Sequence, residues 1–391
     1  MTLLARSFMS TAPNSFDTGR EVAQRIQEGF NELPALVLAY FTVNHDQNAL
    51  LRGLHEVLGG DVPVIGCSAQ GVIGLGAVRE EGYAAGALAL GGPGVTITHA
   101  CVEEIALDAF EKGRELGRAL KRGQPGVPSA VVLHYDALCE VDPDKFLAGL
   151  FSVVECPIVG GAAGHSFNYQ SLQATYVYAG ERVLSGAAVA FAISGAGVEI
   201  GDSLGCSPVG VEMTVTRAEA NKIYELDGRP AADVWTEICG PVTPHANQSA
   251  ALAIGVPITS GARAGGYMVR AAYVVDHETG SVWLGPAIPT GTKIMLHHRT
   301  VEDVLDGSRV MGEELSLRLK GRRARAVLTF ECGARTSPFL GNEATLKENL
   351  ALQKQLDADA WLGMMPWGEL FPVGGRPAFH NYTFPLVVFT D

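Results

Sequence analysis

Four side chains of reactive type follow apolar, strand-like segments near the C-terminal end of the chain. "VLTFECGAR" contains Cys332 and Arg335, "GMMPWGELF" contains Glu369, and "FHNYT" contains His380. A thiol with an imidazole base is the pairing of cysteine hydrolases and acyltransferases. A guanidinium and a carboxylate can instead hold a charged ligand through hydrogen bonds. If one sheet unites these segments, the four side chains converge on one pocket.

Each of these residues also has a purely structural interpretation. Arg335 and Glu369 can simply form an ion pair with each other. A single cysteine after a strand, such as Cys332, is more often a small core residue than a nucleophile. His380 and Asn381 can serve only to tie a turn to backbone groups. From the residues alone, catalytic, binding and structural roles all stay open.

The elements that must position these residues are visible as an internal repeat. "PALVLAYF" begins at Pro34 and "PVIGCSA" at Pro63, while "PSAVVLHYD" begins at Pro128 and "PIVGGAA" at Pro157, a spacing of 29 in both pairs (63 − 34 and 157 − 128). A helical pattern lies between the members of each pair. A strand, a helix and a second strand of these lengths predict a right-handed parallel crossover.

A leading helix and a further apolar strand complete each unit, so that 17–100 and 107–203 form two repeats of helix, strand, helix, strand and strand. A third repeat is indicated in 301–391. There "VEDV" echoes "VEEI" at 102, and "RAVLTFECG" echoes "SAVVLHYD". Short strands and turn signals fill 204–300 and predict an antiparallel sheet, with a hairpin turn at 276–280.

The predicted fold class is therefore α/β, and α+β in part, with two domains built from repeated crossover units. The first domain covers 1–203 and holds two repeats. The second covers 204–391, opens with the antiparallel segment and ends with the third repeat.

Ligands of open α/β sheets bind beyond the carboxyl ends of the strands. Cys67-Ser68 and Gly160-Gly161 end the second strands of the first two repeats, and His134 lies at the end of an earlier strand. The two glycines predict a tight turn, or backbone N–H groups exposed to an anion. The chain has neither a G-x-G-x-x-G nor a Walker pattern, so nothing supports a nucleotide.

Composition excludes several classes of protein. The net charge of −13 and the absence of Lys/Arg runs with interleaved aromatic residues argue against a nucleic-acid partner. Seven scattered cysteines without a C-x-x-C pair argue against structural zinc and predict free thiols in a reducing cytoplasm. The longest apolar run, 183–198, is short for a membrane span. Haem requires only one imidazole or thiolate and an apolar slot, so it stays open as a cofactor.

The chain resembles the FIST family over nearly its whole length. In the N-terminal half the resemblance rests on "PVIGCSAQGVI" and "PIVGGAAG". In the C-terminal half it rests on several motifs, namely "SPVGVEMTVT", "IYELDGRPAADVW", "YMVRAAYVVDHETGSVWLGPAIPTGTKIML", "VLTFECGAR", "GMMPWGELFP" and "FHNYT". One departure is "GMMPWGE", where relatives tend to show Gly-aromatic-small before Gly-Glu, so the lining of the pocket is expected to differ.

The resemblance implies a sensory, ligand-binding module of bacterial signalling, with amino-acid-like molecules as suggested ligands. Some stand-alone members look like haem-containing nitric oxide sensors that work beside histidine kinases or cyclic-di-GMP enzymes. The Cys-x-x-Arg, Gly-Glu and His-Asn-x-Thr elements of the family map onto a set of seven residues. They are Cys332, Arg335, Gly368, Glu369, His380, Asn381 and Thr383.

Three hypotheses follow. In the first, a cytoplasmic sensor binds an amino-acid-like ligand and passes the signal to a separate partner protein. Arg335 would bind the carboxylate of the ligand, Glu369 its ammonium group, and Asn381 would fix its orientation. In the second, a haem-dependent gas sensor uses His380, or else His134, as the axial ligand. In the third, an enzyme uses Cys332 as its nucleophile.

Overall fold

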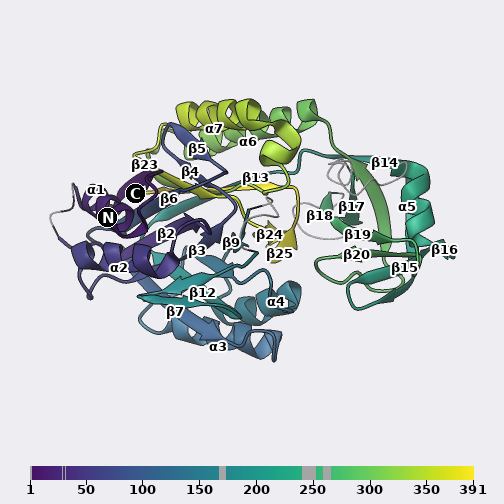
Figure 1. The fold of residues 1–391 in the computed structure, drawn as a ribbon, viewed down its shortest axis with the longest axis horizontal. Helices are drawn as coiled ribbons and strands as arrows, with labels where there is room; N and C mark the ends of the chain where they lie inside the picture. The colour runs from purple at the N-terminus through teal and green to yellow at the C-terminus, as the bar shows by residue number, and fades with distance from the viewer. Residues whose placement is uncertain (1, 29, 31, 167–172, 240–251, 259–265) are drawn as a thin grey trace.

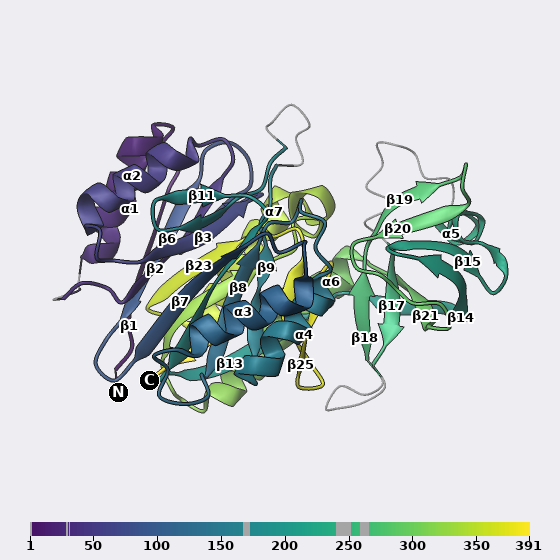
Figure 2. The ribbon, with the colours of Figure 1, turned by 90° about the horizontal axis from the view of Figure 1, so that it is seen from below.

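A computed structural model describes the chain except for residues 1, 29, 31, 167–172, 240–251 and 259–265. It consists of two parts that lie side by side (Figure 1, Figure 2). The larger part, called here the body, is formed by 2–203 and 300–391, and its described residues form three mixed sheets. The smaller part, called here the lobe, is formed by 207–298, and its described residues form antiparallel strands and one helix.

The three sheets of the body are built in the same way. In the first, β2 and β3 are parallel and joined by α2, β6 is antiparallel to β2, and β1 is antiparallel to β6. The second and third sheets repeat this order as β7-β12-β8-β9 and β13-β26-β22-β23. The first set of elements is β1 (Leu4–Ser10), α1 (Ser15–Gln27), β2 (Leu36–Thr42), α2 (Gln47–Leu58), β3 (Val64–Ala69) and β6 (Ala85–Gly91).

The second set is β7 (Thr96–Glu103), α3 (Ala109–Lys121), β8 (Ala130–Tyr135), α4 (Pro143–Val154), β9 (Ile158–Ala162) and β12 (Ala187–Ser194). The third is β13 (Gly197–Ser203), α6 (Val301–Leu319), β22 (Ala324–Phe330), α7 (Asn342–Leu356), β23 (Ala360–Met364) and β26 (Phe384–Thr390). The mixed α/β class predicted from the sequence is confirmed. The predicted correspondence of "VEDV" with "VEEI" is wrong, because Val102 lies in β7 whereas Val301 begins α6.

Each sheet is completed by a hairpin that comes from another repeat. The hairpin after β3 pairs with β23, the hairpin after β9 pairs with β3, and the hairpin after β23 pairs with β9. The three sheets are therefore interlocked in a ring, and the third repeat shares one body with the first two. The hairpins are β4 (Val72–Gly74) with β5 (Ala77–Arg79), β10 (Val177–Ala179) with β11 (Arg182–Leu184), and β24 (Glu369–Val373) with β25 (Arg376–His380).

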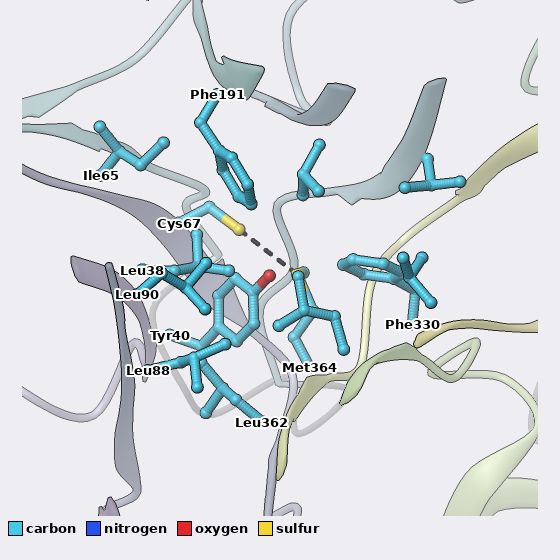
Figure 3. Close-up of a cluster of buried hydrophobic side chains, with 14 of the residues drawn as sticks. Leu38, Tyr40, Ile65, Cys67, Leu88, Leu90, Phe191, Phe330, Leu362 and Met364 are labelled. Atoms are coloured by element: carbon cyan, nitrogen blue, oxygen red, sulfur yellow. Dashed lines mark hydrogen bonds between the residues drawn. The ribbon is translucent and has the colours of Figure 1, made fainter. Parts of the chain in front are cut away.

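Apolar side chains from all three sheets meet at the centre of the body (Figure 3). Tyr40 and Cys67 come from the first sheet, and Phe330 and Met364 from the third. The Cys67 thiol lies 3.5 Å from the sulfur of Met364 and is fully buried. Cys67, predicted as a candidate binding residue, is thus part of the packing between sheets.

Gly66 and Gly160 occupy equivalent places in β3 and β9. Their φ angles are 152° and 146°, and a Cβ would lie 1.8 Å from the carbonyl oxygen of Ala39 or 2.0 Å from that of Leu133. Both glycines therefore allow the neighbouring parallel strand to approach closely. The predicted turn at Gly160-Gly161 is wrong, since both residues lie within β9.

The lobe is inserted into the third repeat, because the chain leaves the body after β13 and returns at α6. All of its strand pairs are antiparallel, and the pairing of Asp276 with Ser281 confirms the predicted hairpin. Its elements are β14 (Ser207–Glu219), β15 (Lys222–Leu226), β16 (Arg229–Pro230), α5 (Ala231–Cys239), β17 (Leu252–Pro257), β18 (Tyr267–Arg270), β19 (Ala272–Asp276), β20 (Ser281–Leu284) and β21 (Lys293–His298). Over the described part of the chain, the helices are all too short or too polar to cross a membrane.

Candidate functional site

A groove of about 650 Å³ lies between the body and the lobe. The body contributes the end of β8 with the segment that follows it, the first turn of α4, Trp367 and Phe379. The lobe contributes two loops and one side chain each of β19 and β20. The segment after β8 is the carboxyl end of a parallel strand, where α/β folds bind ligands. The main lining residues are Tyr135, Cys139, Glu140, Asp142, Lys145, Asn221, Tyr273, Leu284, Ala287, Trp367 and Phe379.

Two sets of hydrogen bonds involve motif residues of the third repeat near the groove. The Oε2 atom of Glu369 accepts from the backbone N and the Oγ1 of Thr383, at 3.0 and 2.9 Å. The neighbouring Asn381 accepts from the backbone N of Ala271 at 3.0 Å and donates to the hydroxyl of Tyr273 at 3.2 Å. Three residues of the predicted site therefore lie close together, and one of them, Asn381, holds the edge of the lobe beside the groove.

Glu369 is fully buried, and burial raises the pKa of its carboxyl group from 4.5 to about 8. The hydrogen bonds from Thr383 and the nearby charge of Arg299 lower this pKa and only partly offset burial. Glu369 is consequently mostly protonated and neutral at pH 7.

Glu369→Gln is expected to change how stability depends on pH. Because the folded state holds this proton up to about pH 8 and the unfolded state releases it near 4.5, the wild type loses stability as pH rises between these values. The uncharged glutamine removes that loss, so the variant should exceed the wild type by roughly 3–5 kcal/mol above pH 8 and match it in acid. Urea unfolding across this range measures the difference. The exposed Glu343→Gln is the control, and equal slopes for wild type and Glu369→Gln would disprove the assignment.

Cys332 is buried close to Glu369. Burial, followed by the charge of Glu369, raises the pKa of the Cys332 thiol well above its ordinary value. A nucleophilic cysteine needs the opposite shift, because the thiolate is the reactive form. The thiol packs with Val269, Ala271 and Tyr382 in a small apolar cluster at the junction of body and lobe. These surroundings fit a packing role.

The guanidinium nearest to this cluster is that of Arg299, which sequence reasoning missed. It lies 4.3 Å from the ring centre of Tyr382 and 4.4 Å from that of Phe339. Its charge lowers the pKa of both Cys332 and Glu369. The sequence feature that could have indicated Arg299 is its position directly after the apolar strand "KIMLHH".

Arg335 lies in a different buried cluster. It donates to the Glu348 carboxylate, to Ser308 Oγ at 2.5 Å and to the carbonyl of Val304 at 3.1 Å, and Glu331 Oε1 lies 3.6 Å from its Nε. The predicted ion pair of Arg335 with Glu369 is therefore wrong. With its guanidinium held between α6 and α7, Arg335 has the contacts of an internal ion pair, which differ from those of a ligand clamp.

The other predicted residues have local roles. Ser68 Oγ donates to the carbonyl of Gly164 at 2.9 Å and accepts from the backbone N of Tyr176 at 3.0 Å, fully buried. Gly368 has a φ of 145°, and a Cβ there would lie 2.2 Å from the ring of Phe379. Gly368 thus makes room for a ring that lines the groove.

The two histidines predicted as haem ligands do not fit that role. His134 uses both ring nitrogens, Nδ1 with the carbonyl of Gly161 at 2.9 Å and Nε2 with the Tyr40 hydroxyl at 3.0 Å. Burial also lowers its pKa to about 4. His380 is fully buried, and its ring is stacked on Phe371 with centroids 3.8 Å apart. An axial ligand needs a ring nitrogen that faces open space for the macrocycle.

The chain combines a three-sheet body with an inserted antiparallel lobe and a groove between them, and comparison with protein families identifies the family. The FIST N domain matches 35–229 and the FIST C domain matches 231–372. The chain therefore belongs to the FIST family, whose domains are sensory domains of signal transduction.

Relatives are found in mycobacteria. An uncharacterised protein of Mycobacterium bovis is 30% identical over 197 residues, which cover 48% of this chain and 50% of the relative. An uncharacterised protein of Mycobacterium tuberculosis is 26% identical over 397 residues, which cover 98% of both chains. The match to the first relative thus spans about half of its length, whereas the second is similar throughout.

Proposed function

We propose that this protein is a sensory module that binds an amino-acid-like small molecule in the groove and signals to a separate partner protein. The observation that carries the proposal is that the groove is lined from both the body and the lobe. A ligand that contacts both parts favours one arrangement of the lobe on the body over others. A partner such as a histidine kinase would respond to that arrangement.

The size and lining of the groove support a small ligand. Pockets for small molecules commonly measure about 300–1,000 Å³ and combine aromatic walls with a few polar groups. Tyr273 and Trp367 offer aromatic surface, and Glu140 offers a carboxylate for an ammonium group. The sequence predicted ligand contacts by Arg335 and Glu369, but both side chains are buried and hydrogen-bonded within the protein. We therefore assign the ligand contacts to residues that line the groove.

Contacts across the junction offer a route for the signal. Arg270 of the lobe is buried and its Nη2 lies 2.9 Å from Asp144 Oδ2 on α4. The other oxygen of Asp144 accepts from the backbone N of Phe379 at 3.2 Å. Asp144 therefore ties the lobe to two repeats of the body directly beneath a groove residue.

Ala287→Trp is expected to abolish ligand binding without unfolding the protein. Ala287 is exposed and lines the groove, so an indole there occupies the space of the ligand. A thermal-shift screen of amino acids and related amines on the wild type identifies stabilising ligands, since a ligand at a hundred times its Kd adds about 2.7 kcal/mol. Their effect should disappear in Ala287→Trp and persist in Ala106→Trp, an exposed control between β7 and α3. An equal shift in both variants would place the ligand outside the groove.

The two alternative functions find less support. A haem sensor would need an imidazole other than those of His134 and His380, whose environments do not suit an axial ligand. A cysteine enzyme would need a thiolate at Cys332, which burial and Glu369 disfavour.

A further inference from the structure

We propose that the groove selects its ligand by a positively charged nitrogen, a protonated amine or a quaternary ammonium, so that the ligand class is organic cations with or without a carboxylate. This inference rests on the proposed function, because it names the chemical group that the same groove recognises. Three observations on the lining support it.

The first observation is an unused hydroxyl. Tyr135 is only 6% exposed and contributes to the lining, yet its hydroxyl makes no hydrogen bond within the described part of the chain. A ligand in the groove can therefore take the place of solvent as the hydrogen-bond partner of this hydroxyl. The phenol oxygen can accept a hydrogen bond from an ammonium N–H.

The second observation is the balance of charges in the lining. Lys145 is the one cation among the described lining residues, and Asp142 lies 3.1 Å from its ammonium nitrogen. Glu140 is a carboxylate without an ion-pair partner within the described residues. A ligand therefore finds a free carboxylate in the groove, whereas the positive charge there is already paired.

The third observation is the aromatic content of the walls. Tyr135, Tyr273, Trp367 and Phe379 all line the groove. Aromatic faces attract ammonium groups, most strongly where water is excluded, and rings gathered around a carboxylate suit protonated and quaternary amines. An amino acid would thus be held by its ammonium end, with its carboxylate toward solvent.

Three related compounds test the inference by isothermal titration calorimetry: phenylalanine, phenylalaninamide and N-acetylphenylalanine. The amide should bind at least as tightly as phenylalanine, because it keeps the ammonium and lacks the carboxylate. The N-acetyl compound, which lacks the positive charge, should bind at least tenfold more weakly. Equal binding of phenylalanine and its N-acetyl form would overturn the inference, and the proposed function would still stand if Ala287→Trp abolished both. Absence of binding by all three at millimolar concentrations would count against both proposals.

Two variants test which groove residues contact the positively charged nitrogen of the ligand. Tyr135→Phe and Glu140→Gln should each weaken binding of phenylalaninamide by about three- to tenfold, since each removes one polar contact. The exposed Glu181→Gln is the matched control and should leave the affinity unchanged. Tyr135→Phe should keep the unfolding free energy of the ligand-free protein or raise it, because the hydroxyl has no partner there. An unchanged affinity in both groove variants would contradict the assignment.

Discussion

Arg335→Met is expected to lower the free energy of unfolding by about 3–5 kcal/mol at pH 7, a loss typical of breaking a buried ion pair. The guanidinium is fully buried, and removing it leaves the buried carboxylate of Glu348 without its cation. Urea unfolding followed by circular dichroism measures the loss. Because protonation neutralises an unpaired carboxylate, the deficit should shrink as the pH falls.

Two further variants separate the buried pair from the general effect of removing an arginine. Arg309→Met breaks two exposed ion pairs on α6, with Asp306 and Glu313, and should cost at most about 1 kcal/mol. Arg335→Met combined with Glu348→Met removes both charges and should recover part of the loss. If Arg335→Met cost no more than Arg309→Met, the buried pair described above would not exist in solution.

Gly66→Ala and Gly160→Ala are each expected to prevent stable folding of the body, with losses above about 4 kcal/mol. The new methyl group would lie 1.8 Å from the carbonyl oxygen of Ala39 or 2.0 Å from that of Leu133, in a backbone conformation that side chains rarely adopt. Neither oxygen can move without breaking the parallel pairing of its strand. Soluble yield and thermal unfolding measure the effect.

Gly60→Ala is the matched control, since a Cβ there meets nothing within 4 Å and the residue follows α2 on the surface. It should change stability by less than about 1 kcal/mol. Normal stability of Gly66→Ala would mean that β2 and β3 do not approach each other as described.

The repeating elements could be predicted because they are encoded locally. The spacing of 29 residues indicated β2 and β3 within two residues of their observed ends, and the helical pattern between the apolar segments indicated α2. The exchange of hairpins among the sheets could not be predicted. The pairing of β4 with β23 joins Val72 to Met364, and no local pattern specifies a partner so distant in the chain.

The candidate site, like the fold, could be predicted only in part. The motif residues Glu369, Asn381 and Thr383 do gather, because β24 and the end of β25 are hydrogen-bonded neighbours. Arg335 was misjudged because its partner Glu348 lies on α7, and a sequence does not show which acid a buried arginine faces. The groove itself escaped prediction since it forms only where the inserted lobe meets the loop after β8.

A crystal structure of the protein with a stabilising amine bound tests the central claim most directly. Density for the ligand is predicted in the groove, with its nitrogen within hydrogen-bond distance of the Tyr135 hydroxyl and near the carboxylate of Glu140. Density elsewhere, for example in the cleft lined by Arg6, Arg323 and Arg325, would contradict the account.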